Sequence, residues 1–364
     1  MPVSLKEIAK RTGLSTAAVS QALRGIGRLS DRTRQSVRTV AEEMGYQPDP
    51  VLSRVLSRMR QSNAAHYRET IAFLTEWALD DGPGHHKQIF AAAAHQAESM
   101  GYKIEVFPVS GNPREQRRMS NILLARGIRG LIILPRLGNP HPRLHFEWKH
   151  LAAVEIGRTL WHPRTLPRVE TSNYHKTTEA IHLLKRVGYR RIGMAIEPAQ
   201  NSHQRGAYYA AFLMSQLRLP ARRRIPVLAT TGPWNEKTFR AWMEKNQPDV
   251  LIVHAVIAPE LVKWLANMKL RVPRDVSLFC MNIQNEKAEN WSGLRRDLTS
   301  MGQSAVEMLS LLLLDGKLGL AGNARCLQID ELWVAGKTLA HPIGEYLTPE
   351  GFLRPSLLRF KVDS

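Results

Sequence analysis

Histidine clusters and a glycine-lysine-threonine run are the residues of this sequence whose types and spacing could support metal binding or catalysis. His141, His145 and His150 lie close together, but neither a cysteine nor a carboxylate completes a metal-ligand pattern with them. Residues 335–338 resemble the end of a phosphate-binding loop, yet Glu331 occupies the position of the loop's first glycine. The chain also has no Gly-x-Ser-x-Gly nucleophile motif. These patterns predict no metal, no cofactor and no enzymatic activity.

The charge of the chain favours a polyanionic partner. Its 364 residues include 51 lysines and arginines against 32 aspartates and glutamates, a formal net charge of +19. Residues 1–68 hold twelve basic and five acidic side chains, which gives this segment a net charge of +7. Only Cys280 and Cys326 are present, and the longest apolar run, residues 308–314, is too short to span a membrane. We therefore expect a globular cytoplasmic protein.

The basic N-terminal segment begins with the signals of two short helices. Ser4 and Glu7 form a capping-box pattern for the first helix, and Gly13 ends it. Ser15 can cap a second helix over residues 16–24. Because so few residues separate them, the two helices must meet at a tight angle, as in a helix-turn-helix.

A third helix is expected to close a small core around this angle. It begins at the Ser30-Asp31 cap and continues to Gly45. Ile8 and Val19 are spaced so that their side chains fill the space between the first two helices. Residues 1–47 are therefore predicted to be a three-helix DNA-binding headpiece.

Beyond residue 69 the sequence alternates short apolar runs with helical patterns. Strands separated by helices imply parallel sheets with right-handed crossovers, and the remaining length is enough for two such subdomains. We therefore expect an α/β core of doubly wound parallel sheets. The candidate strands are residues 71–77, 103–108, 130–134, 151–156, 191–196, 250–253 and 276–281.

The N-terminal residues MPVSLKEIAKRTGLSTAAVSQALRG and RLSDRTRQSVRTVAEEMGYQPDP resemble the start of the lac-repressor/galactose-repressor (LacI/GalR) family of bacterial transcription regulators. RVPRDVSL, at residues 271–278, resembles the core of the same family. The resemblance implies a two-lobed, periplasmic-binding-protein-like core over residues 69–341, which binds an effector and forms a dimer. Residues 342–364 are a C-terminal extension to which no role is assigned.

The resemblance also implies which headpiece residues contact DNA. In the family the second helix enters the major groove, and the base-reading positions here are Thr16, Ala17 and Gln21. Glutamine can bond twice to adenine, whereas Ala17 can contact only a thymine methyl group. The expected phosphate-contacting residues are Ser4, Ser15, Ser20, Arg24, Arg28 and Arg34.

Residues 48–60 are expected to form a hinge helix, which family members pair across a dimer to insert a leucine into the minor groove. Aligned from Tyr46, the inserting position holds Val55, and the usual small neighbour is Leu52. Three interpretations stay open: Val55 inserts weakly, Leu56 inserts after a small rotation, or the apolar stripe only packs between protomers.

The positions that match the family's sugar-binding residues are altered. Ser172 stands where an acidic residue is common, Asn282 replaces an aspartate, and Gln204, with Arg205 beside it, stands where an arginine is common. Asparagine and glutamine still offer donors and acceptors to hydroxyl groups. Two further residues, Trp77 and Trp291, could stack on a sugar ring or pack in the core. We expect an uncharged or weakly polar effector, the alternative being a cleft without effector control.

The resulting hypothesis is a homodimeric, sequence-specific regulator of carbohydrate genes, expected to be a repressor, that binds a pseudopalindromic operator and a sugar-like effector. The alternative is an α/β ligand-binding or sugar-modifying protein with a basic appendage that binds nucleic acid without specificity. A discrete footprint on DNA would favour the first, and uniform binding to any duplex the second.

Overall fold

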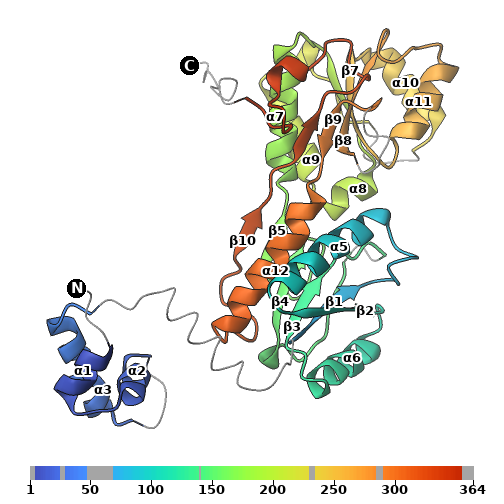
Figure 1. Cartoon of the computed structure of the whole chain (residues 1–364). Coiled ribbons are helices and arrows are strands. Elements are labelled where there is room, and N and C mark those ends of the chain that lie inside the picture. The colour runs from blue at the N-terminus through green and yellow to red at the C-terminus, as the bar shows by residue number, and fades with distance from the viewer. Residues whose placement is uncertain are drawn as a thin grey trace. The chain divides into compact units, whose positions relative to one another are not determined.

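A computed structural model of the chain describes residues 5–24, 29–46, 69–138, 141–228, 234–283 and 290–354. The chain divides into two compact units, Met1–Tyr67 and Arg68–Ser364. The second unit contains two lobes, each built around one β-sheet (Figure 1). The expected hinge, residues 48–60, lies outside the described residues.

The first unit is a three-helix headpiece. Its helices are α1 (Leu5–Thr12), α2 (Thr16–Arg24) and α3 (Asp31–Glu43). Gly13, between α1 and α2, has φ +69°, a left-handed conformation that side chains disfavour. Ser15 caps α2 by accepting a hydrogen bond from the backbone N–H of Ala18 at 3.2 Å. The helix-turn-helix read from the sequence is confirmed within the described residues, whereas the cap expected from Ser4 lies outside them.

The first lobe contains a six-stranded parallel sheet in the order β10-β5-β4-β3-β1-β2. Helices α5 (Gly84–Ser99) and α12 (Leu298–Leu314) cover one face of the sheet, and α6 (Pro113–Ala125) covers the other. Gly302 lets α12 approach α5 closely, because a Cβ at this position would lie 2.5 Å from the carbonyl oxygen of Ile89. The strands are β1 (Thr70–Thr75), β2 (Lys103–Pro108), β3 (Gly130–Ile133), β4 (Ala152–Ile156), β5 (Arg168–Glu170) and β10 (Cys326–Gln328).

The second lobe contains a five-stranded sheet in the order β11-β9-β8-β7-β6, in which only β11 is antiparallel to its neighbour. Its strands are β6 (Ile192–Ala195), β7 (Val250–His254), β8 (Ser277–Ile283), β9 (Gly293–Arg295) and β11 (Leu332–Val334). One face packs on α7 (Asn173–Arg186) and α9 (Ala207–Leu217), and the other on α10 (Glu236–Asn246) and α11 (Ala258–Asn267). The short α8 (Pro198–His203) follows β6.

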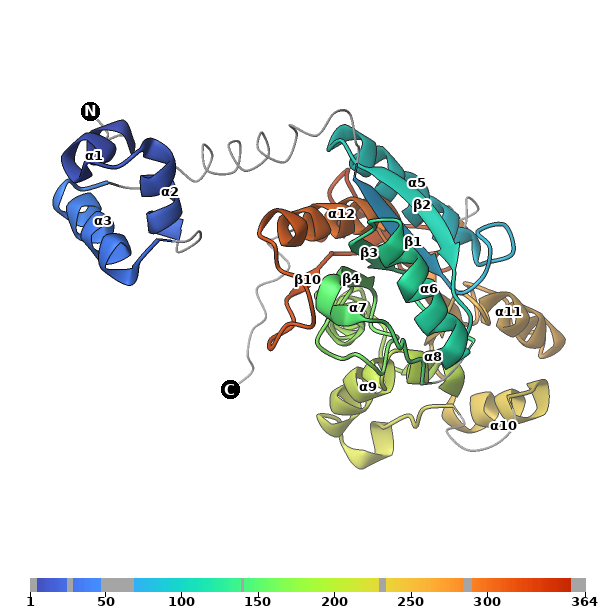
Figure 2. The ribbon, with the colours of Figure 1, turned by 90° about the horizontal axis from the view of Figure 1, so that it is seen from below.

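The chain passes between the two lobes three times. It leaves the first lobe after β5, returns after β9 to form α12, and crosses again between β10 and β11. Figures 1 and 2 show α12 packed beside α5 in the first lobe, although the two helices are about 200 residues apart in the sequence. The expected two-lobed core of doubly wound sheets is confirmed. Every candidate strand is present within about two residues at each end, but β5, β9, β10 and β11 were not predicted.

Candidate functional site

The headpiece exposes one face of α2. Val19 and Ala22 are fully buried against Ile8 and Val37, so the opposite face of the helix is turned to solvent. Gln21 lies on that exposed face. An α-helix with a free polar face, held by a tight turn on a second helix, is the form in which proteins place side chains in the major groove.

The structure places the expected DNA contacts as follows. Ser15, Thr16 and Gln21 are exposed, and Ser20 is half-buried. Arg34 lies 3.5 Å from the Asp31 carboxylate in the first turn of α3. For Ala17 and Arg24 the backbone belongs to α2 while the side chains lie outside what the structure describes. Ser4, Arg28, Leu52, Val55 and Leu56 also lie outside the described residues.

A cleft of about 270 Å³ separates the two lobes of the core. It lies at the carboxyl ends of strands from both sheets, which is where open α/β folds bind ligands. From the first lobe come Ile156, Thr159 and Glu170, at the ends of β4 and β5. From the second come His254 and Asn282, on β7 and β8. Further lining residues include Leu137, Arg158, Gln200, His203, Gln204, Arg296 and Met301.

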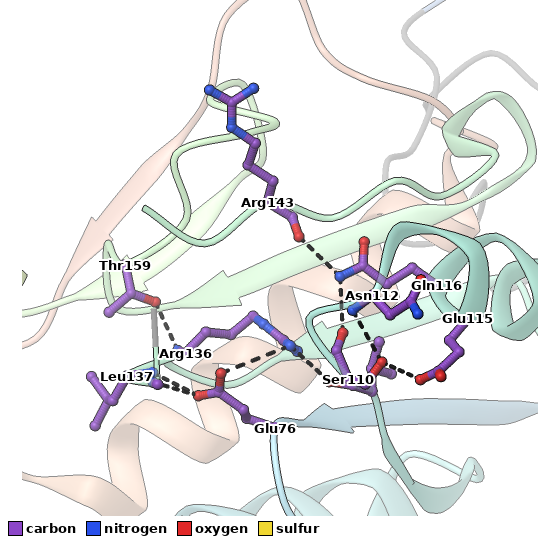
Figure 3. Close-up of polar contacts among 11 residues, drawn as sticks. Glu76, Ser110, Asn112, Glu115, Gln116, Arg136, Leu137, Arg143 and Thr159 are labelled. Carbon is purple, nitrogen blue, oxygen red and sulfur yellow. Dashed lines mark hydrogen bonds and ion pairs between the residues drawn. The ribbon is translucent and has the colours of Figure 1, made fainter. Parts of the chain in front are cut away.

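The first-lobe wall of the cleft is held by polar contacts (Figure 3). Glu76, just after β1, accepts hydrogen bonds from the backbone N–H groups of Leu137 at 2.8 Å and Gly138 at 3.0 Å. The buried guanidinium of Arg136 donates to the carbonyl oxygen of Val109 at 2.7 Å. The backbone N–H of Arg136 donates to Thr159 Oγ1 at 2.9 Å. These bonds fix Leu137 and Thr159, both of which line the cleft.

Asn282 presents a polar group to the cleft. It is 4% exposed, and one end of its side-chain amide lies 3.2 Å from Nε2 of His254. The other end of the amide is buried and has no hydrogen-bond partner among the described residues. Because a buried polar group without a partner is costly, this end of the amide is a natural partner for a ligand hydroxyl group, which can both donate and accept.

His254 is held neutral beside Asn282. Burial, as the larger cause, and the positive charge of Arg296 together lower its pKa to about 3. Its Nδ1 accepts a hydrogen bond from the backbone N–H of Val256 at 3.3 Å, which places the proton of the neutral imidazole on Nε2. A neutral imidazole in this position adds a polar contact without adding charge to the cleft.

Both cleft arginines already have carboxylate partners. Arg158 donates from Nε and Nη2 to the two oxygens of Glu170, at 2.8 and 2.7 Å, a bidentate arrangement that raises the arginine's pKa. Arg296 lies 3.7 Å from the fully buried Glu331, whose pKa burial raises. Because these charges are paired within the protein, the cleft favours a neutral ligand over an anion.

Of the six effector residues expected from the sequence, Gln204 and Asn282 line the cleft. Ser172 does not line the cleft, although its neighbour Thr171 does. Ser172 instead caps α7 by accepting a hydrogen bond from the backbone N–H of His175 at 3.4 Å.

The other three expected residues, Arg205, Trp77 and Trp291, are not among the cleft-lining residues. Arg205 contacts the first lobe outside the cleft. Trp77 is half-buried, and Trp291 packs against the core between the second sheet and α10 and α11. Core packing was the alternative weighed for both tryptophans.

The sequence did not predict four polar or charged residues of the cleft, namely Arg158, Glu170, His254 and Arg296. Glu170 directly follows a buried valine at the end of β5, and His254 ends the apolar run of β7. A polar residue at the carboxyl end of a buried strand was the available signal for both. Arg158 and Arg296 carried no such signal, because their partners lie on other segments of the chain.

A helix-turn-helix headpiece joined in one chain to a two-lobed, ligand-cleft core defines a class of ligand-responsive DNA-binding regulators. Comparison with known families supports this class. Residues 4–49 match the family described as bacterial regulatory proteins, lacI family, and residues 181–324 match a periplasmic binding protein-like domain.

Individual proteins give the same result over nearly the whole chain. The transcriptional repressor CytR of Escherichia coli (strain K12) is 24% identical over 93% of this chain and 97% of its own length. The structure is similar to that of the lac repressor dimer bound to operator and an anti-inducer, with TM-score 0.55, 20% identity, and coverage of 93% of this chain and 100% of that one. A complex of the regulator CelR with cellobiose has TM-score 0.53 and 17% identity, and covers 92% and 99% of the two chains.

The chain belongs to the LacI family of bacterial transcription regulators. It is therefore a DNA-binding regulator and not an enzyme, because the members of this family are transcription regulators. Within the described residues no helix is long and apolar enough to cross a membrane.

Proposed function

We propose that this protein is a homodimeric repressor of carbohydrate genes in the cytoplasm, and that a neutral sugar bound in the inter-lobe cleft changes its affinity for a pseudopalindromic operator. The buried end of the Asn282 amide that has no hydrogen-bond partner, in a cleft whose arginines are already paired, is the observation that carries the effector part of this proposal.

Base reading is proposed for Thr16, Ala17 and Gln21 on α2. The buried Val19 and Ala22 fix which side of the helix faces outward, and Gln21 is exposed on that side. Its amide can bond to N6 and N7 of adenine in the major groove. Ser15 and Ser20, with the basic residues of the headpiece, are proposed to contact phosphates. Since one headpiece reads only a few base pairs, two are needed for a useful specificity, which supports a twofold dimer.

A neutral sugar fits the hydrogen-bonding groups of the cleft. Gln204 Oε1 accepts from Asn173 Nδ2 at 2.7 Å, which leaves the glutamine's own amide protons for a ligand. Asn282 supplies one end of a buried amide group, and Ile156 and Met301 supply apolar surface. Convergent donors and acceptors on a partly apolar wall are typical of a site for hydroxyl-rich ligands.

The relatives agree with this assignment in what their names state. CytR is named a repressor, CelR was solved with cellobiose, and the lac repressor was solved as a dimer bound to operator. We extend these properties to the present chain as repression, sugar binding and dimer formation.

Two experiments test the proposal. Selection of bound sequences from a random DNA pool should return a pseudopalindrome, and recovery of unrelated sequences would contradict specific operator binding. A thermal-shift screen of neutral sugars should then find a stabilising ligand, since binding to the folded state stabilises by about 2.7 kcal/mol at a hundredfold excess over Kd.

Variants connect that ligand to the cleft. Gln204→Ala should weaken the shift, as should Asn282→Gly, which deletes the amide while tolerating the backbone φ of +62° at this position. Asn267→Ala, on the exposed side of α11, is the control and should bind normally. A sugar whose shift survives both cleft variants would show that the pocket is wrongly assigned.

A further inference from the structure

A groove between α7 and α9 on the second lobe carries basic side chains that the proposed function does not use. Its volume is about 100 Å³. The two helices lie side by side (Figures 1 and 2). None of the groove residues lines the inter-lobe cleft. The groove is lined by Tyr174, Thr178, Ile181, His182 and Lys185 of α7, by Ala211, Met214 and Ser215 of α9, and by Arg218.

This part of the chain is more basic than the headpiece. Residues 174–224 contain ten lysines and arginines and two glutamates, a net charge of +8 in 51 residues, against +7 for residues 1–68. The second of these glutamates, Glu197, precedes α8 and is not a groove residue. An excess of this size outside the DNA-binding unit needs an explanation of its own.

Neither helix supplies a carboxylate to the groove. The single acidic residue of α7, Glu179, accepts from Lys176 Nζ at 2.9 Å and lies 3.1 Å from His175 Nε2. Helix α9 contains no acidic residue. In the part of the chain that the structure describes, no ion pair within 4 Å joins Lys185 or Arg218 to a carboxylate, whereas Lys176 on the same helix has two such partners.

The basic side chains of the groove act on one another. Burial lowers the pKa of the Lys185 ammonium, and the charge of Arg218 lowers it further. Burial likewise lowers the pKa of His182, with added contributions from Lys185 and Arg218. An anion placed among the three groups would reverse this repulsion. The hydroxyls of Thr178 and Ser215 donate to backbone carbonyl oxygens, so the charged donors that line the groove are Lys185 and Arg218.

We propose that the α7–α9 groove binds a phosphate group, free or as the phosphomonoester of a small metabolite, at a site separate from the effector cleft. The Arg218 guanidinium can bond to two phosphate oxygens, while Lys185 supplies a point charge. Ile181 and Met214 form an apolar wall on which the organic part of a phosphomonoester can lie.

The His182 imidazole gives a direct readout in the full-length protein. Its pKa is followed by histidine NMR, with His182→Gln used to assign the signal. Inorganic phosphate, titrated at constant ionic strength against chloride, should raise the His182 pKa in a saturable manner by about one unit, a tenfold change in protonation. If the natural ligand is a phosphomonoester, glucose 6-phosphate should raise the His182 pKa at a lower concentration than inorganic phosphate does. If the natural ligand is free phosphate, the two should act at the same concentration. Glucose should have no effect.

Two double variants distinguish specific phosphate binding in the groove from a general electrostatic effect of added anions. Lys185→Gln with Arg218→Gln should raise the His182 pKa without phosphate and abolish its response to phosphate. Arg222→Gln with Arg223→Gln removes the same charge from the exposed turn after α9 and should leave the response intact. The proposal is overturned if the change in the His182 pKa does not saturate with phosphate, or if glucose produces the same change. It is also overturned if the Lys185→Gln, Arg218→Gln variant still responds to phosphate, or if the Arg222→Gln, Arg223→Gln variant loses the response to the same extent.

Discussion

Arg205, at the elbow between α8 and α9 of the second lobe, donates from Nη2 to the backbone carbonyl oxygen of Leu160 in the first lobe, at 2.7 Å. The same guanidinium lies over the Trp161 ring, with Cζ 5.3 Å from the ring centroid. Arg205 has φ +52°, so the elbow is bent in a way that most side chains disfavour. This contact joins the lobes beside the cleft and favours the closed arrangement in which the cleft residues face one another.

Arg205→Ala should therefore loosen the closed arrangement of the lobes. Hydrogen bonds from charged groups contribute about 1.5 to 3 kcal/mol, so the loss should increase amide exchange at residues 157–167 and the radius of gyration of the core. Hydrogen exchange and small-angle scattering measure the two effects.

Arg164→Ala is the matched control for this prediction. Arg164 also stacks on the Trp161 ring, at 5.2 Å, but it belongs to the first lobe and donates to the carbonyl oxygen of Trp161 itself. Its removal should leave the lobes closed. Equal behaviour of the two variants would mean that the Arg205 contact does not hold the lobes together.

Gln21→Ala should weaken binding to the selected operator by about 1 to 3 kcal/mol and relax preference at one base pair in each half-site. The reason is the loss of a bidentate contact from the exposed face of α2. Gln35→Ala, an exposed glutamine on α3, is the control and should bind like the parent. If Gln21→Ala weakened binding to random DNA as much as to the operator, the residue would be a phosphate contact and not a base reader.

The hinge residues can be distinguished by comparing Val55→Ala with Leu56→Ala. A side chain inserted into the minor groove partly unstacks two base pairs and bends the DNA, and the bend allows further contacts with the protein. Truncation of that side chain should therefore reduce both the bend and the affinity. Circular-permutation mobility assays measure the bend, and the variant with the larger loss identifies the inserting residue. Two variants that bend DNA like the parent would leave dimer packing as the role of this stripe, including Leu52.

The strands that the sequence predicted are those whose signal is local. Buried runs such as residues 130–134 and 250–253 are apolar throughout, as strands covered on both faces must be. The missed strands have three residues each. Cys326–Gln328 is exposed along its whole length, and it is a strand only because it pairs with Arg168–Glu170. Pairing between segments some 150 residues apart leaves no pattern in either segment.

The same distinction applies to the cleft. Gln204 and Asn282 were expected because they match the family's sugar-binding positions, each of which can be located within its own short segment of sequence. The pairing of Arg158 with Glu170 depends on how β4, β5 and the crossing segments are arranged, which no residue spacing encodes. Of the two roles left open for Trp291, the structure shows core packing, to which an aromatic residue near a cleft is equally suited.

Burial of His254 predicts a pH dependence of core stability. Its pKa in the folded protein is about 3, below its usual value of 6.5, so between these values the unfolded chain binds more protons. Stability is therefore fully present above pH 6.5 and declines as the pH falls. Between pH 7.5 and pH 5 this one group should remove about 2 kcal/mol from the free energy of unfolding, at 1.36 kcal/mol per pKa unit.

His254→Asn isolates this contribution. The asparagine oxygen can accept the Val256 N–H in place of Nδ1, and it does not titrate. His86, with a pKa near 4, acts in the same direction, and Glu155, with a pKa near 7, acts in the opposite one, but both are common to the two proteins and cancel in the difference. All eight tryptophans lie in the core unit, so urea unfolding followed by tryptophan fluorescence reports on it alone. The parent should lose about 2 kcal/mol more than the variant on going from pH 7.5 to pH 5, and parallel losses would mean that His254 is already accessible to protons in the folded cleft.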